Sequence, residues 1–379
     1  MKKIICLLCA VIMITLNCNL LVSAEELSIN AKASILMEMS TGKVLYENNA
    51  DEQLPIASVT KIMTMLLIME AVDSGKIALD DMVTVSERAM SMGGSTMFLE
   101  TGEQFTVSDM LKGIAVASAN DGAVAMAEFI AGSESGFVAM MNEKAKELGM
   151  ENSSFMNTNG LDTDGHYSSA RDVAIMSREL LKHEKIFEYT TIWMDSLRDG
   201  KTQLANTNKL VRFYKGANGL KTGSTSKALC CLSAAAKRDN MQLIAVVLGA
   251  PSSKDRFAGA STLLDYGFAN YAVKQAVVQE EVLGDVSVSK GDRASINAVA
   301  KNEFAFLVDK GSNKEVERNV QFQENLTAPV EKGEVIGKLE LLSDNEVIGS
   351  IDIVAGEGAA KKSFAAMLGD VFKCWLNKQ

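Results

Sequence analysis

Histidine and cysteine, which supply most zinc ligands in proteins, are scarce in this chain of 379 residues. The two histidines, His166 and His183, stand in no metal-ligand spacing. Three of the six cysteines lie near the N-terminus, and the other three are Cys230, Cys231 and Cys374, two of them adjacent. These counts argue against a bound metal and against a disulfide framework, and nothing in the sequence calls for a cofactor.

Basic residues are also fewer than acidic ones: the chain has 38 lysines and arginines and 48 aspartates and glutamates. The formal net charge of -10 argues against nucleic acid as a partner. Lys2 and Lys3 precede an apolar stretch, residues 4–16, and a small-residue cleavage site that ends at Ala24. We therefore expect residues 1–24 to be a secretory signal peptide. The alternative is a retained membrane anchor, although the apolar stretch is too short to span a bilayer comfortably.

Strand-like segments lie at both ends of the larger part of the chain, residues 25–272. Residues 34–47 are typical of a hairpin, and so are the β-type runs 228–235 and 242–248. The segments between them are mostly helical, which predicts an α+β fold in which a helical block is inserted into a sheet. The expected helices are 58–75, 107–117, 122–130, 136–148, 171–182 and 254–266, the last ending at Gly267.

The rest of the chain, residues 273–379, has a different sequence pattern. Short β-type runs separated by turns recur over residues 273–356, which predicts a small all-β domain. Residues 357–379 are charged and amphipathic. A helical face would carry Phe364, Met367, Leu368, Val371 and Trp375. This pattern favours a helix that lies on a membrane surface, and the alternative is a helix that docks on the β domain.

The most informative stretch begins at Pro55 and continues into an apolar run, residues 62–69. Pro55 is typical of the start of a helix, and the run predicts a helix buried on all sides. Such a helix has no use for a lysine in its first turn unless the amine has a role. Ser58 and Lys61 are three residues apart, so their side chains lie on one helical face. A hydroxyl beside a desolvated amine is a candidate activated nucleophile.

The Ser-x-x-Lys pattern alone is weak, because it occurs at Ser40/Lys43, Ser58/Lys61, Ser224/Lys227 and Ser287/Lys290. Only the copy at Ser58 begins a buried helix. With Ser58 as the first member, one Ser-x-Asn pattern, Ser118 and Asn120, lies before the single Lys-Thr-Gly at Lys221-Thr222-Gly223. This ordered set is typical of penicillin-binding proteins and class A β-lactamases.

These residues resemble those of a secreted D-alanyl-D-alanine carboxypeptidase, a low-molecular-mass penicillin-binding protein of the serine β-lactamase/DD-peptidase superfamily. The stretches 41–47, 57–61, 118–121, 165–172 and 219–223 carry the resemblance, which covers the mature chain. It implies a serine DD-peptidase catalytic domain at 25–272, with an antiparallel sheet covered by helices and an inserted helical subdomain. The small β-rich domain and the amphipathic membrane-associating helix follow it.

The resemblance also implies roles for the motif residues. Ser58 Oγ would attack the carbonyl between two D-alanines to form an acyl-enzyme, and Lys61 would accept its proton. Ser118 would relay a proton to the leaving amine, and Asn120 would hold the substrate amide. The other assignments are Lys221, Thr222 and Arg256 to the substrate carboxylate, Gly223 to close approach of the strand to the substrate, and the N–H groups of Ser58 and Ser224 to the oxyanion hole.

The expected partners are peptidoglycan stem peptides ending in D-Ala-D-Ala, β-lactams as covalent inhibitors, and the outer face of the bacterial cytoplasmic membrane. Two other functions stay open. A class A β-lactamase needs a glutamate that activates the deacylating water, and no Glu-x-x-Leu-Asn stretch lies between Asn120 and Lys221. We therefore expect a long-lived penicilloyl-enzyme. A non-catalytic penicillin-binding or wall-binding protein could share the fold, but the lysine beside Ser58 argues against it.

Some residues near the motifs have plainer interpretations. Ser118 and Asn120 could end one helix and cap the next, which is compatible with catalysis. His166 is expected to be structural, because lysine is the base in enzymes of this kind. Arg171 and Asp172 are expected to form a stabilising ion pair.

Overall fold

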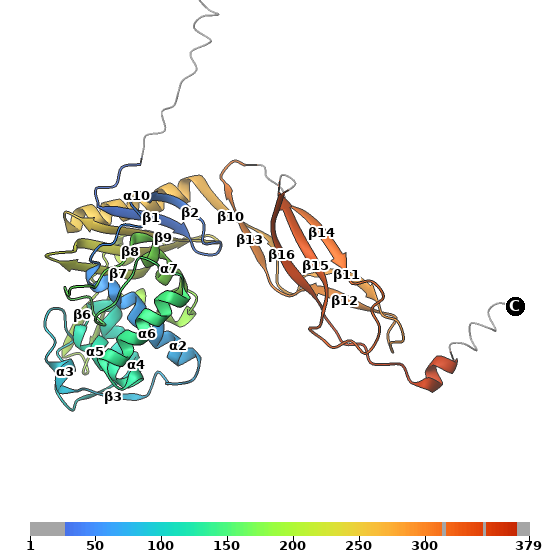
Figure 1. Ribbon diagram of the computed structural model, residues 1–379, viewed down its shortest axis with the longest axis horizontal. Coiled ribbons are helices and arrows are strands. Elements are labelled where there is room, and N and C mark those ends of the chain that lie inside the picture. Colours follow the sequence, from blue (N-terminus) through green and yellow to red (C-terminus); the bar gives the residue numbers. More distant parts are fainter. Residues whose placement is uncertain (1–26, 313–315, 344–345, 370–379) are drawn as a thin grey trace, which may run out of the picture.

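The computed structural model describes residues 27–312, 316–343 and 346–369. The predicted signal peptide lies outside these residues. The described chain forms two parts: a larger α+β part at the N-terminal side, followed by an elongated β-rich part that leads to the C-terminus (Figure 1). The larger part contains every motif named above.

Five antiparallel strands form the central sheet of the larger part, in the order β2-β1-β9-β8-β7. The N-terminal strand β1 lies beside β9, with Ile35 opposite Val246. Strands from both ends of this part therefore close one sheet, as predicted, and the α+β fold is confirmed. The bounds are β1 (Ala33–Glu38), β2 (Val44–Asn48), β7 (Ala217–Thr225), β8 (Leu229–Arg238) and β9 (Met241–Ala250).

Helices cover this sheet and fill the insertion between β2 and β7 (Figure 1). They are η1 (Ala57–Thr60), α2 (Lys61–Asp73), α3 (Glu87–Met90), α4 (Val107–Lys112), η2 (Gly113–Ala117), α5 (Asn120–Ala131), α6 (Glu134–Glu147), α7 (Ala170–Leu180), η3 (Glu184–Ile186), α8 (Phe187–Thr190), α9 (Leu210–Phe213) and α10 (Ser253–Asn270). Two small antiparallel sheets pair β3 (Met82–Thr84) with β4 (Gln104–Thr106) and β5 (Met194–Leu197) with β6 (Thr202–Ala205).

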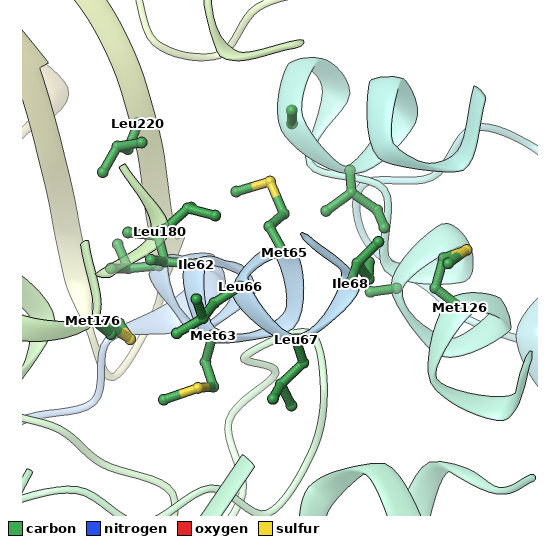
Figure 2. Packing of buried hydrophobic residues seen from close by; sticks show 14 of the residues in the cluster. Ile62, Met63, Met65, Leu66, Leu67, Ile68, Met126, Met176, Leu180 and Leu220 are labelled. Atoms are coloured by element: carbon green, nitrogen blue, oxygen red, sulfur yellow. The ribbon is translucent and has the colours of Figure 1, made fainter. Parts of the chain in front are cut away.

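Helix α2 is the buried centre of the larger part. Every residue from Lys61 to Met69 is buried, so the helix has no solvent face before its last turn, as predicted from the apolar run. Figure 2 shows its side chains pointing outward in all directions, with Met176 and Leu180 on one side and Met126 on the other. Burial of one such side chain contributes about 1.5–3 kcal/mol to folding. This packing fixes α2, and the turn before it, relative to the sheet.

Helix α10 extends beyond the end predicted for it. We expected Gly267 to stop the helix, but the helix continues to Asn270. Gly267 has a different purpose, because a Cβ there would lie 2.5 Å from Leu243 Cδ1 and 2.9 Å from Leu36 Cδ2. The glycine lets α10 approach the sheet closely.

The β-rich part has its own sheet and its own core. Its strands follow the order β11-β12-β16-β15-β14, and β10 pairs separately with β13. Buried residues such as Ile296, Ile336 and Leu339 pack together. The bounds are β10 (Tyr271–Val277), β11 (Val282–Ser287), β12 (Ser295–Ala300), β13 (Phe304–Asp309), β14 (Glu317–Phe322), β15 (Val335–Ser343) and β16 (Glu346–Ala355). The predicted all-β character of this region is confirmed.

Within the described ranges, no individual helix has the length and apolar character needed to cross a membrane. Helices α5 and α6 reach that length and composition only when taken together, and they meet at an angle of 85°. Most of α5 is buried in the core, as expected of a helix inside a folded domain.

The contact at Gly267 gives a test of the fold. We expect Gly267→Ala to lower the free energy of unfolding by about 1–2 kcal/mol, because overpacking a core costs about 1–3 kcal/mol and alanine recovers up to about 1 kcal/mol of helix propensity. Thr262→Ala, at an exposed position of the same helix, is the control and should change stability by less than about 0.5 kcal/mol. Urea unfolding would measure both. Equal stability of the two variants would contradict close packing at Gly267.

Candidate active site

The amine of Lys61 is the centre of a buried hydrogen-bond cluster. Lys61 is fully buried, and its Nζ lies 2.9 Å from Ser58 Oγ. It also donates to Asn120 Oδ1 at 2.6 Å and to the backbone carbonyl of Asn159 at 2.8 Å. When the amine is neutral, its two N–H groups donate to Asn120 and Asn159 and its lone pair faces the Ser58 hydroxyl, so its position and direction are fixed.

Burial sets the protonation of this amine. Desolvation is the main cause that holds the pKa of Lys61 well below its ordinary value, and the positive charge of Lys221 acts in the same direction. Asp121 opposes them. Its carboxylate is itself held by the backbone N–H groups of Met97 and Leu99. A neutral lysine amine in contact with a serine hydroxyl can accept that hydroxyl's proton.

Ser58 lies in η1, the short turn that leads into α2, rather than in the α-helix itself. The first N–H groups of a helix have no acceptor within the helix, so the Ser58 N–H is free of the helical ladder. The residue before it, Ala57, has a φ of 49°. Non-glycine residues adopt this left-handed conformation only under tertiary constraint.

Ser118 and Asn120 come from the junction between two helices. The π-helix η2 ends at Ala117, and Ser118, the residue after it, has a left-handed φ of 64° before α5 begins. Such π-turns often occur at functional sites. The side chain of Asn120 does not cap α5, because Oδ1 accepts from Lys61 and Nδ2 donates to the Gly93 carbonyl at 2.7 Å. The helix-capping interpretation of this residue is therefore wrong.

Strand β7 places Lys221 and Thr222 on the other side of the site. Strand β7 is an edge strand of the sheet, so part of its backbone faces away from β8. Lys221 is fully buried, and its Nζ donates to the Thr222 carbonyl at 2.9 Å. Burial, aided by the charge of Arg256, lowers the pKa of Lys221 to about 7. Thr222 Oγ1 donates to Thr207 Oγ1 at 2.7 Å.

Gly223 is needed by the protein itself. A Cβ at this position would lie 2.7 Å from the Ile56 carbonyl and 2.9 Å from the Ser58 nitrogen. The glycine therefore lets β7 pack against the turn that carries Ser58, and its role in close approach to the substrate stays a prediction. Ser224, which follows, is exposed.

Arg256 reaches the site from helix α10 behind the sheet. Its Nη1 donates to the Gly223 carbonyl at 2.9 Å, and Nη2 contacts Ser253 Oγ at 3.3 Å. Its Nε is buried and has no partner among the described residues. Arg256 thus supports β7 and adds positive charge beside Lys221.

The loop 155–166 completes the hydrogen-bond cluster around Lys61. The sequence motifs did not predict that this loop belongs to the site. Its Asn159 carbonyl accepts from Lys61, as described above, and the side chain of its His166 contacts Thr60 Oγ1 at 2.8 Å. A backbone carbonyl acts in the same way whatever the side chain, so no sequence pattern could have identified Asn159. Among the described residues, no group of three or more acidic, histidine or cysteine side chains could hold a metal ion.

The predicted ion pair between Arg171 and Asp172 is wrong. Arg171 Nε instead donates to Asp51 at 2.7 Å, and its Nη2 donates to Glu47 at the same distance. Asp172 points inward and accepts from Ser153 Oγ at 2.7 Å. Adjacent residues on a helix point in different directions, so this pair could not have met.

Family comparisons cover both parts of the chain. A family model described as D-alanyl-D-alanine carboxypeptidase (peptidase S11) matches residues 21–252. One described as penicillin-binding protein 5, C-terminal domain, matches residues 271–361. The D-alanyl-D-alanine carboxypeptidase DacF of Bacillus subtilis is 47% identical over 355 residues, which is 93% of this chain and 91% of that protein. The corresponding enzyme DacC of Escherichia coli is 34% identical over 92% of this chain and 89% of that protein.

Solved structures show the same architecture. Penicillin-binding protein 5 from Haemophilus influenzae superimposes with a TM-score of 0.73 at 33% identity, covering 88% of this chain and 98% of that one. Penicillin-binding protein D2 from Listeria monocytogenes, in its ampicillin-bound form, has a TM-score of 0.59 at 32% identity, covering 64% of this chain and 99% of that one. The serine–lysine cluster, the sheet that supports it and these matches lead to one conclusion: the chain belongs to the D-alanyl-D-alanine carboxypeptidase family, peptidase family S11.

Proposed function

We propose that this carboxypeptidase removes the terminal D-alanine from peptidoglycan stem peptides through an acyl-enzyme on Ser58. The observation that carries the proposal is the 2.9 Å contact between Ser58 Oγ and the buried Nζ of Lys61. Ser58 Oγ attacks the carbonyl carbon between the two D-alanines, and its proton passes to Lys61. The carbon–nitrogen bond then breaks, the departing amine takes up a proton through Ser118, and water hydrolyses the remaining ester.

The developing oxyanion needs donors that are in place before the reaction. The N–H of Ser58 belongs to the turn held by β7 and by the loop 155–166, and Ser224 lies at the end of β7. We assign the oxyanion hole to these two N–H groups. Asn120 is fixed by Lys61 and Gly93, and it can align the substrate amide.

The terminal carboxylate of the substrate would bind beside Lys221 and Thr222. Lys221 and Arg256 place two basic side chains in the buried region beside the neutral amine of Lys61. A carboxylate offsets their positive charge, and its contact with Lys221 is charge-assisted. The same features suit β-lactams, whose carboxylate and strained amide resemble the end of the peptide, so we propose that they acylate Ser58.

The C-terminal segment would hold the enzyme at the outer face of the cytoplasmic membrane after export. Residues 364–369 are helical, and Phe364 and Leu368 are 79% and 48% exposed. Residues 370–379 lie outside the described chain. This segment starts at the end of the β-rich part that is remote from the active site (Figure 1). An exposed apolar helical face beside lysines supports binding to an anionic membrane surface.

Loss of the Ser58 hydroxyl should remove both acylation and turnover. We expect the wild-type protein to gain the mass of one benzylpenicillin and to release D-alanine from diacetyl-Lys-D-Ala-D-Ala. Ser58→Ala should show no adduct and at least about a thousandfold slower release, because the attacking atom is lost. Ser287→Ala, in another Ser-x-x-Lys pattern, is the control and should behave as the wild type. Intact-mass spectrometry would measure the adduct, and an assay of free D-alanine would measure its release. An adduct on Ser58→Ala would refute the assignment.

The lifetime of the adduct separates a carboxypeptidase from a β-lactamase. We expect the penicilloyl mass to persist after excess penicillin is removed, since the sequence lacks the Glu-x-x-Leu-Asn stretch of class A enzymes. Rapid steady-state hydrolysis of the drug would contradict this expectation.

The pKa of Lys221 predicts a dependence on pH. Its pKa of about 7 means that the amine is protonated below this pH and loses its charge above it, so binding of the substrate carboxylate should weaken as pH rises. We expect kcat/KM for diacetyl-Lys-D-Ala-D-Ala to fall by up to about tenfold per pH unit above the pKa of Lys221. In Lys221→Arg, whose guanidinium stays charged, this fall in kcat/KM should begin at a higher pH. A wild-type profile that stays flat up to pH 9 would exclude titration of a carboxylate-binding Lys221.

Truncation tests the membrane segment. Lys361 forms an isolated antiparallel β-bridge with Gly291, and the Lys362 N–H donates to the Lys290 carbonyl. These two lysines therefore belong to the β-rich part. We therefore expect a protein that ends at Ser363 to leave the membrane fraction while its kcat/KM stays within about twofold of wild type. Phe364→Ser together with Leu368→Ser, in the full chain, should weaken membrane binding in the same direction. Unchanged sedimentation of the truncated protein with vesicles would contradict the proposal.

A further inference from the structure

His166 is buried beside the site, and none of the roles above uses it. Its side chain is 7% exposed, and both ring nitrogens have partners. The backbone N–H of Met156 lies 3.0 Å from Nδ1, and Thr60 Oγ1 lies 2.8 Å from Nε2. The ring of Phe155 packs against the imidazole edge to face. The imidazole is therefore fixed in both position and orientation.

These contacts define the direction of every hydrogen bond in the group. A backbone N–H only donates, so Nδ1 accepts from Met156 and the proton of the neutral ring lies on Nε2. Nε2–H then donates to Thr60 Oγ1, and the Thr60 hydroxyl proton is left to donate to the Ala57 carbonyl, 2.8 Å away. Burial keeps the ring neutral, because it lowers the pKa of His166 to about 4. An ordered chain of three hydrogen bonds thus ends at the Ala57 carbonyl.

The Ala57 carbonyl and the Ser58 N–H belong to the same peptide group. This group is planar and trans, so the two bonds point in opposite directions and turn together. The φ of Ala57, 49°, is unfavourable for alanine and needs support from its surroundings. Whatever fixes the carbonyl of Ala57 also aims the N–H of Ser58.

The backbone of the loop 155–166 confines the same carbonyl. Gly160 has a φ of 86°, and a Cβ at this residue would lie 1.9 Å from the Ala57 oxygen and 2.8 Å from Thr60 Oγ1. The loop therefore lies directly against the Ala57–Thr60 hydrogen bond. The loop 155–166 therefore supplies both the backbone at Gly160 that contacts Ala57 and the imidazole of His166.

We propose that His166 is a positioning residue for the oxyanion hole, which acts through Thr60 to fix the Ala57–Ser58 peptide and so aim the Ser58 N–H at the developing oxyanion. This inference rests on the role proposed above for that N–H. His166 does not touch the substrate in this account. Its effect should therefore appear in the rate of acylation rather than in the binding that precedes it, because the oxyanion forms only in the transition state.

Two substitutions at His166 separate hydrogen bonding from packing. His166→Leu keeps an apolar side chain but removes both hydrogen bonds. His166→Gln keeps them, because its amide oxygen can accept from Met156 and its NH₂ group can donate to Thr60. Stopped-flow acylation by a chromogenic cephalosporin gives the dissociation constant K of the initial complex and the acylation rate constant k2. We expect His166→Leu to lower k2 by about tenfold to a hundredfold, with K within about twofold, and His166→Gln to stay within about threefold of wild type in k2.

Thr60 and Thr64 provide a matched pair on the same buried chain segment. Both are fully buried, and Thr64 Oγ1 donates to the Thr158 carbonyl of the same loop at 2.6 Å. Thr60→Val should lower k2 as His166→Leu does, and the double variant should be no slower than the slower single one, since both remove one chain of hydrogen bonds. Thr64→Val removes an equally buried hydroxyl that does not reach Ala57. It should lower the melting temperature and leave k2 unchanged.

The outcomes distinguish this inference from the proposed function. If the wild type forms no acyl-enzyme, the function itself fails. The inference alone fails if the wild type acylates normally and His166→Leu keeps its k2. It also fails if His166→Leu changes K rather than k2, if His166→Gln is as slow as His166→Leu, or if Thr64→Val is as slow as Thr60→Val.

Discussion

The enclosure of the Lys61 amine is the constraint on which the rest of the active site depends. A charged ammonium is costly to bury, so the protein holds the pKa of this amine low and surrounds it with three hydrogen-bond partners. The partners come from the turn before α2, from α5 and from the loop 155–166. Each must stay within hydrogen-bond distance of one nitrogen atom, so the positions of three segments that are distant in sequence are tied together. The apolar sides of α2 then fix that nitrogen relative to the sheet.

The motif residues were predictable from the sequence, because the chemistry requires particular side chains at particular spacings. Ser58 and Lys61 are three residues apart, the buried apolar run after them distinguished this pair from three similar ones, and the order of the motifs then selected Ser118 and Asn120. The structure places Asn120 beside Lys61 and Lys221 near enough for its charge to lower the pKa of Lys61. The α+β fold and the all-β part were predictable for a related reason, since hydrophobic periodicity and turn residues report local structure.

What could not be predicted depends on backbone atoms and on close approaches between distant segments. The Asn159 carbonyl has no signature in its side chain, and the left-handed φ of Ala57 occurs at a residue that rarely adopts it. Gly267 was misread for the same reason. It appeared as a helix stop, whereas it accommodates side chains of the sheet, and the contact of Gly223 with the Ser58 turn was equally invisible in the sequence. A sequence shows that a residue lacks a side chain, but only the fold shows which atom occupies the space.

The loop 155–166 links the two halves of the proposed chemistry. Through the Asn159 carbonyl it holds the base, and through Gly160 and His166 it confines the peptide that presents the Ser58 N–H. A shift of this loop would therefore disturb proton transfer and oxyanion stabilisation at the same time. The loop is in turn fixed to the far wall of the site, since Thr225 Oγ1 at the end of β7 donates to Asp162 at 2.7 Å. Because β7 also carries Lys221 and Ser224, one connected set of contacts positions the base, the oxyanion donors and the carboxylate site, and none of these contacts requires the substrate to be present.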